Sequence, residues 1–272
     1  MSEVPMGSRD DVLAGGGTGG TTSSPMAFPI PAEELGAVSI VPNGSFEAGS
    51  YQTFVLTYVA GKFGIDDSGS MRVCFRFASD QTRPQFEDPK GPNYTTIEAS
   101  NNAVLTYHYD PKGNVRPWDR TLYIKVVRGF LREGDKITIT FGDRSGGSPG
   151  MRLQTFCEDS YEFHTLIDPI ATYCYQPMPV QPVIKIIPGK PDRYLAVAPT
   201  IRAIDESFSI KFKGEDKWGN PSDQCDIKLY PRASHPVKNL PDMISLKPGE
   251  FLGVIDGLSV ADAADLYIDF LD

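Results

Sequence analysis

Hydrophobic and polar positions alternate along many short stretches of this chain, most clearly in residues 116–141. Apolar side chains occupy every second position in residues 122–126 and again in residues 137–141. A period of two is typical of a β-strand with one buried face. The polar residues 132–135 separate the two halves, so this stretch predicts two strands joined by a turn.

The same alternation predicts further strands on both sides of this pair. In the N-terminal half they are expected at residues 38–41, 52–60, 71–77 and 103–109. Residues 153–157 and 161–167 predict two further strands or one bent strand. In the C-terminal half they are expected at residues 183–187, 194–198, 207–213, 226–230, 243–246, 251–255 and 266–271. The sequence therefore predicts an all-β protein of two sandwich units. Gly- and Pro-containing turns between the later strands are typical of an immunoglobulin-like sandwich.

Changes in composition predict where the units begin and end. Residues 1–35 are rich in Gly, Ser and Thr, which predicts a flexible tail. Residues 36–175 form the first predicted sandwich. The proline-rich residues 176–182 predict an extended linker, because proline fixes the backbone and removes a donor. The second predicted sandwich covers residues 183–272. Its last strand has no closing partner after it, so we expect a truncated sandwich that lacks a final strand.

Composition and charge exclude several functions. The 272 residues carry 26 basic and 35 acidic side chains, a net charge of −9, which disfavours nucleic-acid and anionic-membrane partners. There is no apolar run of about 18 residues and no secretory leader, so a cytoplasmic protein is expected. The 4 cysteines are not paired as C-x-x-C, which argues against a zinc site.

Few residues offer catalytic or metal chemistry. The chain has 3 histidines, and His108 and His164 both fall in predicted strands. With Glu158 they could bind a metal ion if neighbouring strands brought them together. Two ordinary strand histidines are the simpler interpretation. No spacing indicates a nucleophile with its base, and no cofactor is expected.

A ligand site is the other candidate. Guanidinium groups and an indole recognise carboxylates, sulfates or sugars by ionic hydrogen bonds and stacking. The candidate residues are Arg116, Trp118, Asp119, Arg120, Arg144 and Arg152. The alternative is that these residues form structural pairs between loops, for example Arg120 with Asp143.

Three segments carry a family resemblance: GIDDSGSMRVCFRFASDQTRPQF (64–86), PKGNVRPWDRTLYIKVVRGFLREGDKITITFGDRSGGSPGMRLQTF (111–156) and DPIATY (168–173). They resemble a large bacterial family of unknown function whose longer members resemble PHP-type metal-dependent hydrolases. The resemblance implies a β-rich N-terminal half, matched here over residues 36–272, followed by a catalytic half. The catalytic Asp-x-His-Gly motif does not occur in this chain, so no metal ligand is carried over.

We therefore expect a noncatalytic, β-rich accessory module. Its expected partner is a hydrolase domain on a longer chain or on a separate subunit. Two alternatives remain open. The chain is a carbohydrate- or anion-binding module built around Trp118 and the arginines, or it is a self-sufficient metal-dependent hydrolase that uses His108 and His164.

Overall fold

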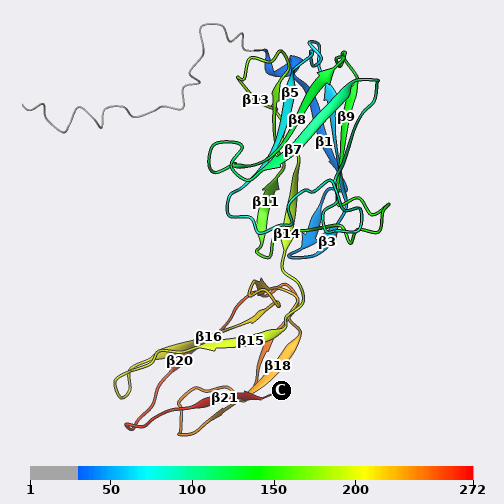
Figure 1. Cartoon of the computed structure of the whole chain (residues 1–272). Coiled ribbons are helices and arrows are strands. Elements are labelled where there is room, and N and C mark those ends of the chain that lie inside the picture. The colour runs from blue at the N-terminus through cyan, green and yellow to red at the C-terminus, as the bar shows by residue number, and fades with distance from the viewer. Residues whose placement is uncertain (1–29, 272) are drawn as a thin grey trace, which may run out of the picture.

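The computed structural model describes residues 30–271, and in that range the chain is almost entirely β-strand. The one helical element described is a short 3-10 turn, Ala32–Glu34. The strands form two units that follow one another along the chain (Figure 1). Each unit encloses its own hydrophobic core. The predicted all-β fold with two sandwich units is confirmed.

Two sheets form the body of the first unit. One sheet has the order β1-β4-β9-β6, with bounds Gly36–Val41, Phe54–Ala60, Lys136–Phe141 and Thr96–Ala99. The other has the order β13-β12-β5-β8-β7, with bounds Gln176–Pro177, His164–Asp168, Ser70–Phe75, Arg120–Arg128 and Val104–Asp110. The two strands predicted from residues 116–141 are β8 and β9. They lie in different sheets, so they are not paired with each other.

The sequence alternation explains how these sheets pack. In β4 every second residue is fully buried, and the antiparallel register places Phe54 opposite Phe141 and Leu56 opposite Ile139. The inner face of β5 meets them from the other sheet, where Phe75 contacts Phe141 edge to face. Strict alternation in both sheets therefore produces a single apolar layer between them.

Two small sheets close the end of this unit that is lower in Figure 1. One has the order β11-β14-β2, with bounds Glu158–Glu162, Val183–Ile187 and Ser45–Glu47. The other pairs β10 (Met151–Arg152) with β3 (Tyr51–Gln52). The assignment of residues 183–187 to the second unit was wrong. These residues pair with β11 and β2, and Ile184 and Ile186 are buried in the first core.

The predicted linker, residues 176–182, also belongs to the first unit. It contains β13, and Met178 is buried in the first core. The side chain of Gln181 accepts a hydrogen bond from Thr165 N and donates one to Thr165 O. The prolines of this segment have no backbone N–H to donate to the neighbouring strand β12. The side-chain amide of Gln181 takes the place of a backbone partner for Thr165 in that strand.

The end of the predicted N-terminal tail is folded as well. Ile30 and Leu35 are buried in the first core, and the hydroxyl of Tyr58 donates to Leu35 O at 2.8 Å. The prediction that the flexible tail extends to residue 35 was therefore wrong, because residues 30–35 are already part of the first unit. The remainder of that predicted tail, residues 1–29, lies outside the described residues.

The second unit is a smaller sandwich. Its first sheet contains β15, β16, β17 and β20, with bounds Arg193–Val197, Phe208–Glu215, Pro221–Ser222 and Gly253–Leu258. Its second has the order β19-β18-β21, with bounds Ile244–Leu246, Ile227–Ala233 and Ile268–Leu271. Ile210, Phe212, Leu229 and Leu258 are among the residues of the core between them. The immunoglobulin-like assignment stays a prediction.

Residues 188–192 connect the units, and a turn of the second unit docks on the first. The indole nitrogen of Trp218 donates to Ala48 O at 3.0 Å. The side chain of Asn220 donates to Thr155 O at 2.9 Å and accepts from Cys157 N at 3.1 Å. The connection is therefore supported by side chains that cross from one unit to the other.

Candidate functional site

Two residues singled out for different chemistries in the sequence meet in the first unit. The rings of Trp118 and His164 are stacked, with centroids 4.7 Å apart and planes inclined by 15°. Trp118 lies in the loop before β8, and His164 begins β12. The strand β5 runs between β8 and β12 in the sheet, with Cys74 opposite both Thr121 and His164. The sheet order therefore brings the two rings together.

Two carboxylates and one arginine complete this group. The His164 Nδ1 shares a 2.6 Å hydrogen bond with Glu162 Oε1. The guanidinium carbon of Arg76 lies 5.3 Å from the centre of the Trp118 ring, and Arg76 Nη1 is 3.1 Å from Glu158 Oε1. We call Arg76, Trp118, Glu158, Glu162 and His164 the Trp118 cluster. It unites Trp118 with His164 and Glu158 from the predicted metal set.

A second arginine sits beside the cluster. The guanidinium carbon of Arg116 lies 4.8 Å from the centre of the Phe77 ring, and Arg116 Nε is 3.4 Å from Asp119 Oδ2. The backbone explains why the two arginines are neighbours. Phe77 N donates to Pro117 O at 2.9 Å, just beyond the ends of the paired strands β5 and β8. Each arginine thus lies on an aromatic ring supplied by the opposite loop.

Burial gives this surface its electrostatic character. In the Arg76–Glu158 pair the side chains are 51% and 16% exposed, and in the Arg116–Asp119 pair they are 74% and 12% exposed. In both pairs the carboxylate is the less exposed member, and the guanidinium faces solvent. A ligand that approaches therefore meets cationic groups that less exposed acids hold in place.

The other predicted ligand residues have structural contacts. Arg120 Nη1 donates inward to Ser79 O, and Arg144 Nη2 donates to Tyr51 O at 2.8 Å. Arg152 contacts both the carboxylate and the backbone oxygen of Asp80. These arginines join loops, as the structural alternative expected. The suggested Arg120–Asp143 pair is wrong, because Asp143 instead accepts from Thr96 Oγ1 and Ser145 N.

The predicted metal set does not assemble. His108 lies on β7 and His164 on β12, with β8 and β5 between them in the sheet. Neighbouring strands are about 4.8 Å apart, so the two histidines are separated by roughly 14 Å of sheet. Glu158 is occupied, since Oε1 binds Arg76 and Oε2 accepts from Gln154 at 2.9 Å. Within residues 30–271 no group of three or more His, Cys, Asp or Glu side chains is arranged to hold a metal ion.

Polar atoms without partners lie in the same part of the unit. In the part of the chain that the structure describes, three buried side-chain oxygen atoms have no hydrogen-bond partner, namely Asp119 Oδ1, Gln81 Oε1 and the Tyr161 hydroxyl oxygen. Complete burial raises the pKa of Tyr161 well above its ordinary value, so the hydroxyl stays protonated. Unpartnered buried oxygens are costly, and they mark places where a water molecule or a ligand donor would stabilise the site.

Sequence reasoning missed Arg76, Phe77 and Glu162 as members of this surface. The alternation of β5 does place Arg76 on the same face as Arg72 and Cys74, which was the available signal. The same alternation also predicts that Phe77 is buried. However, β5 ends at Phe75, and Phe77 is 44% exposed, with the Arg116 guanidinium lying over its ring.

Comparison with known proteins does not name a relative. No protein-family model matches the chain, and no curated protein matches it. In the described residues no helix has the length and hydrophobicity needed to span a membrane.

Proposed function

We propose that the chain is a noncatalytic recognition module whose first unit binds an anionic group on its ligand. A carboxylate or sulfate, including one carried by a sugar, is the chemistry that suits the site. The observation that carries this proposal is that Arg76 and Arg116 face solvent while their acidic partners are far less exposed. Planar guanidinium forks match such anions through paired hydrogen bonds.

Stacking supports the anion over an uncharged sugar. Trp118 already packs against His164 and Arg76, and its ring is half-buried. Sugar recognition by aromatic stacking needs an open ring face. The rings here instead support the guanidinium groups, which keeps their donors oriented toward a ligand and lowers the entropy lost on binding.

The family resemblance extends the proposal to a larger assembly. If the chain is the β-rich half of a PHP-type hydrolase family, its partner is a catalytic domain, and the anion site positions substrate for that domain. The cytoplasm is the compartment we propose for it. A self-sufficient metal hydrolase has no observation in its favour, because His108 and His164 lie on separated strands.

The binding test compares a trimer of galacturonic acid with its uncharged galactose counterpart by titration calorimetry. We expect the acidic trimer to bind and the neutral trimer to bind much more weakly. Arg76→Ala and Arg116→Ala should each weaken binding about tenfold, since a hydrogen bond to a charged group contributes about 1.5–3 kcal/mol. High salt should weaken binding of the acidic trimer, because it screens the attraction between the arginines and the carboxylates.

Arg128→Ala is the matched control. Arg128 is exposed and lies at the opposite end of β8 from the Trp118 cluster, so its loss changes the net charge equally without touching the site. Equal weakening by Arg128→Ala would mean that the effect is general electrostatics, and it would contradict the proposal.

A separate experiment tests for catalysis. The metal content of the purified chain is measured together with its hydrolysis of esters. Turnover that His164→Ala abolishes would contradict a noncatalytic role.

A further inference from the structure

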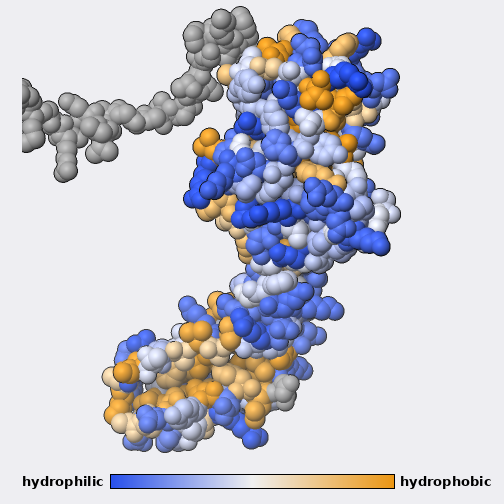
Figure 2. Space-filling view, in the orientation of Figure 1, coloured by the Kyte–Doolittle hydropathy of each residue, from blue (hydrophilic) through white to orange (hydrophobic). Residues whose placement is uncertain are grey.

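The second unit contains a cleft, lined mostly by residues of apolar type, that the proposed function does not use. It has a volume of about 490 Å³ and is lined by residues that include Ile201, Phe208, Ile210, Ile268 and Phe270. A neighbouring hollow of about 440 Å³ shares Ala196, Ile268 and Phe270 with it and extends it toward Phe212 and Leu229. Figure 2 shows extensive hydrophobic surface on this unit. The cleft reaches the core of the sandwich.

The two sides of the cleft are the edges of two different sheets. Within residues 30–271, β15 pairs only with β16, and β21 pairs only with β18. Three consecutive residues of each strand line the second hollow, namely 194–196 and 268–270. Successive side chains of a strand point to opposite faces, so consecutive lining residues mean that each strand presents its edge to the cleft.

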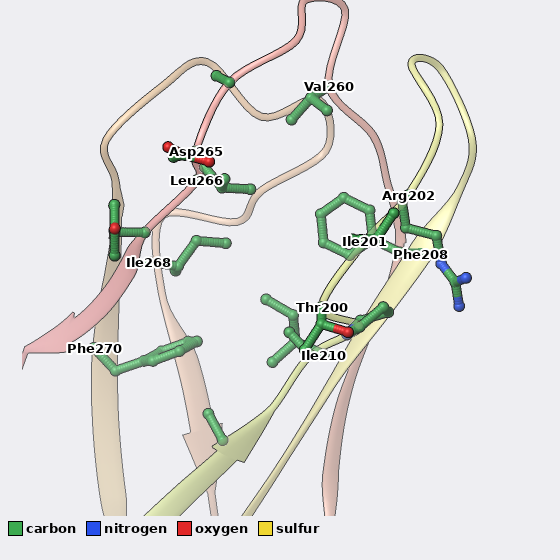
Figure 3. A pocket seen from close by; sticks show the side chains of 15 residues that line it. Thr200, Ile201, Arg202, Phe208, Ile210, Val260, Asp265, Leu266, Ile268 and Phe270 are labelled. Atoms are coloured by element: carbon green, nitrogen blue, oxygen red, sulfur yellow. The ribbon is translucent and has the colours of Figure 1, made fainter.

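Both edges offer backbone groups as well as apolar contacts. All five residues of β15 are exposed, among them Tyr194 and Leu195 at 38% and Val197 at 65%. In Figure 3 Ile268 and Phe270 lie across the cavity from Phe208 and Ile210. A free strand edge has unpaired N–H and C=O groups, which proteins normally cover or protect with charge. An extended polypeptide is the ligand that satisfies backbone groups and fills apolar space together.

Charge at the rim defines this polypeptide further. On the β15 side, Arg193 is paired with Glu215 and Arg202 with Glu206. On the β21 side, Asp265 and Asp269 line the cleft and form no ion pair within the described part of the chain. Arg232 is opposite Asp269 in the strand register but does not line the cleft. Among the charged residues that do line it, Arg202 is paired and the two aspartates are not, so the unpaired charge of the lining is negative.

We propose that this cleft binds a β-strand of a partner polypeptide that has apolar residues at alternate positions and basic residues between them. The strand lies between β15 and β21 and extends the sandwich. Its apolar side chains pack over Ile210, Phe212 and Phe270, and its basic side chains face Asp265 and Asp269. This site is separate from the anion site and does not depend on it.

The test uses a fluorescent peptide of about nine residues, KVTVKVTVK, which is long enough to cover either edge. Anisotropy with the full chain should show saturable binding, and hydrogen exchange should show new protection in β15 and β21. Replacing both threonines by proline should abolish binding, because proline removes donors and distorts the strand. Replacing the lysines by glutamate should weaken binding strongly. Equal binding by the proline peptide, or protection elsewhere, would overturn the proposal.

Variants of the chain locate the peptide. Ala196→Glu places a charge in the apolar lining and should weaken binding about tenfold or more. Asp265→Asn with Asp269→Asn should weaken it less and reduce its dependence on salt. Asp256→Asn is the control, since Asp256 is exposed on β20 in the same unit but does not line the cleft. Circular dichroism confirms that each variant is folded.

A second copy of the chain is the competing occupant. If sedimentation shows that the protein alone is a dimer, and Ala196→Glu makes it a monomer, the cleft is filled by another copy and the proposal is wrong. A monomer that binds the lysine peptide with the expected protection supports the proposal.

Discussion

Trp118 stacks on His164, with ring centroids 4.7 Å apart, and this contact joins the loop before β8 to the first residue of β12. The two strands are not neighbours, because β5 lies between them. The stack therefore crosses the C-terminal end of β5, the central strand of this sheet. It also fixes the ring on which the Arg76 guanidinium lies.

A double-mutant cycle measures this contact. We expect Trp118→Ala and His164→Ala each to lower the free energy of unfolding, and the double variant to lose less than the two losses added. Aromatic pairs contribute about 0.5–1.5 kcal/mol beyond their buried area, which sets the expected coupling. Urea unfolding of the four proteins provides the values. Additive losses would mean that the rings are adjacent but energetically independent.

Gly49 controls the contact between the two units. A Cβ at this position would lie 2.5 Å from Trp218 Nε1, so Gly49→Ala should displace the indole from Ala48. The expected result is faster hydrogen exchange in residues 216–220. Gly134→Ala is the control, because Gly134 also has a positive φ but no atom within 4 Å of its Cβ position. It carries the same backbone strain without the collision. Unchanged exchange in Gly49→Ala would show that Trp218 does not hold the units together.

Asp216 makes the contact between Trp218 and Ala48 sensitive to acid, because its carboxylate holds the turn that carries Trp218. Burial alone would raise the pKa of this carboxyl, but hydrogen bonds from Asn220, Gly189 N and Trp218 N hold the pKa below its ordinary value of 3.8. A lowered pKa in the folded state means that the carboxylate stabilises the turn above pH 3.8. That stabilisation is lost as the pH falls below 3.8 through the folded-state pKa.

Hydrogen exchange of residues 216–220 as a function of pH tests this relation. After correction for the intrinsic rate, protection should fall in acid in the wild-type protein. In the Asp216→Asn variant, the amides of residues 216–220 should be less protected at every pH. Their protection should also depend less on pH below 3.8. An acid response that is the same in both proteins would assign it to another group.

The second unit contains a close contact between Gly253 and Phe212. A Cβ on Gly253 would lie 2.0 Å from the Phe212 ring, so Gly253→Ala should force the ring to move. Overpacking of this kind costs about 1–3 kcal/mol. Gly189→Ala is the control, since the nearest atom to its Cβ position is 3.7 Å away. Thermal unfolding of both variants gives the comparison. Equal midpoints would show that the core around Phe212 adapts without cost.

The sequence predicted most of the strands but not their partners. The strand expected at residues 153–157 was wrong, because these residues lie between β10 and β11 and form no strand. Alternation in residues 183–187 correctly indicated a strand, because burial of one face is a local property. The proline-rich segment before it indicated a boundary, but Gln181 replaces the missing backbone partners and keeps the chain in the first unit. No local pattern in the sequence shows that the Gln181 side chain will hydrogen-bond to the backbone of Thr165 in β12, 16 residues earlier.

The candidate site shows the same division. Trp118, His164 and Glu158 were each recognised by residue type, but they were assigned to two different sites. Their union depends on the order of β8, β5 and β12 in one sheet, which alternation does not encode. The same order separates His108 from His164. Residue types predicted the chemistry, and only the sheet order showed which residues share a site.

The parallel pairing of β2 with β14 has a consequence for synthesis on the ribosome. Ser45 is opposite Lys185, so β2 emerges long before the strand that completes its sheet. At about 5–20 residues per second, the ribosome needs on the order of 10–30 s to add the intervening segment. During that interval β2 lacks its partner, and the lower end of the first unit closes only when β14 arrives. The nascent chain is therefore most exposed to misassembly before the second unit has been made.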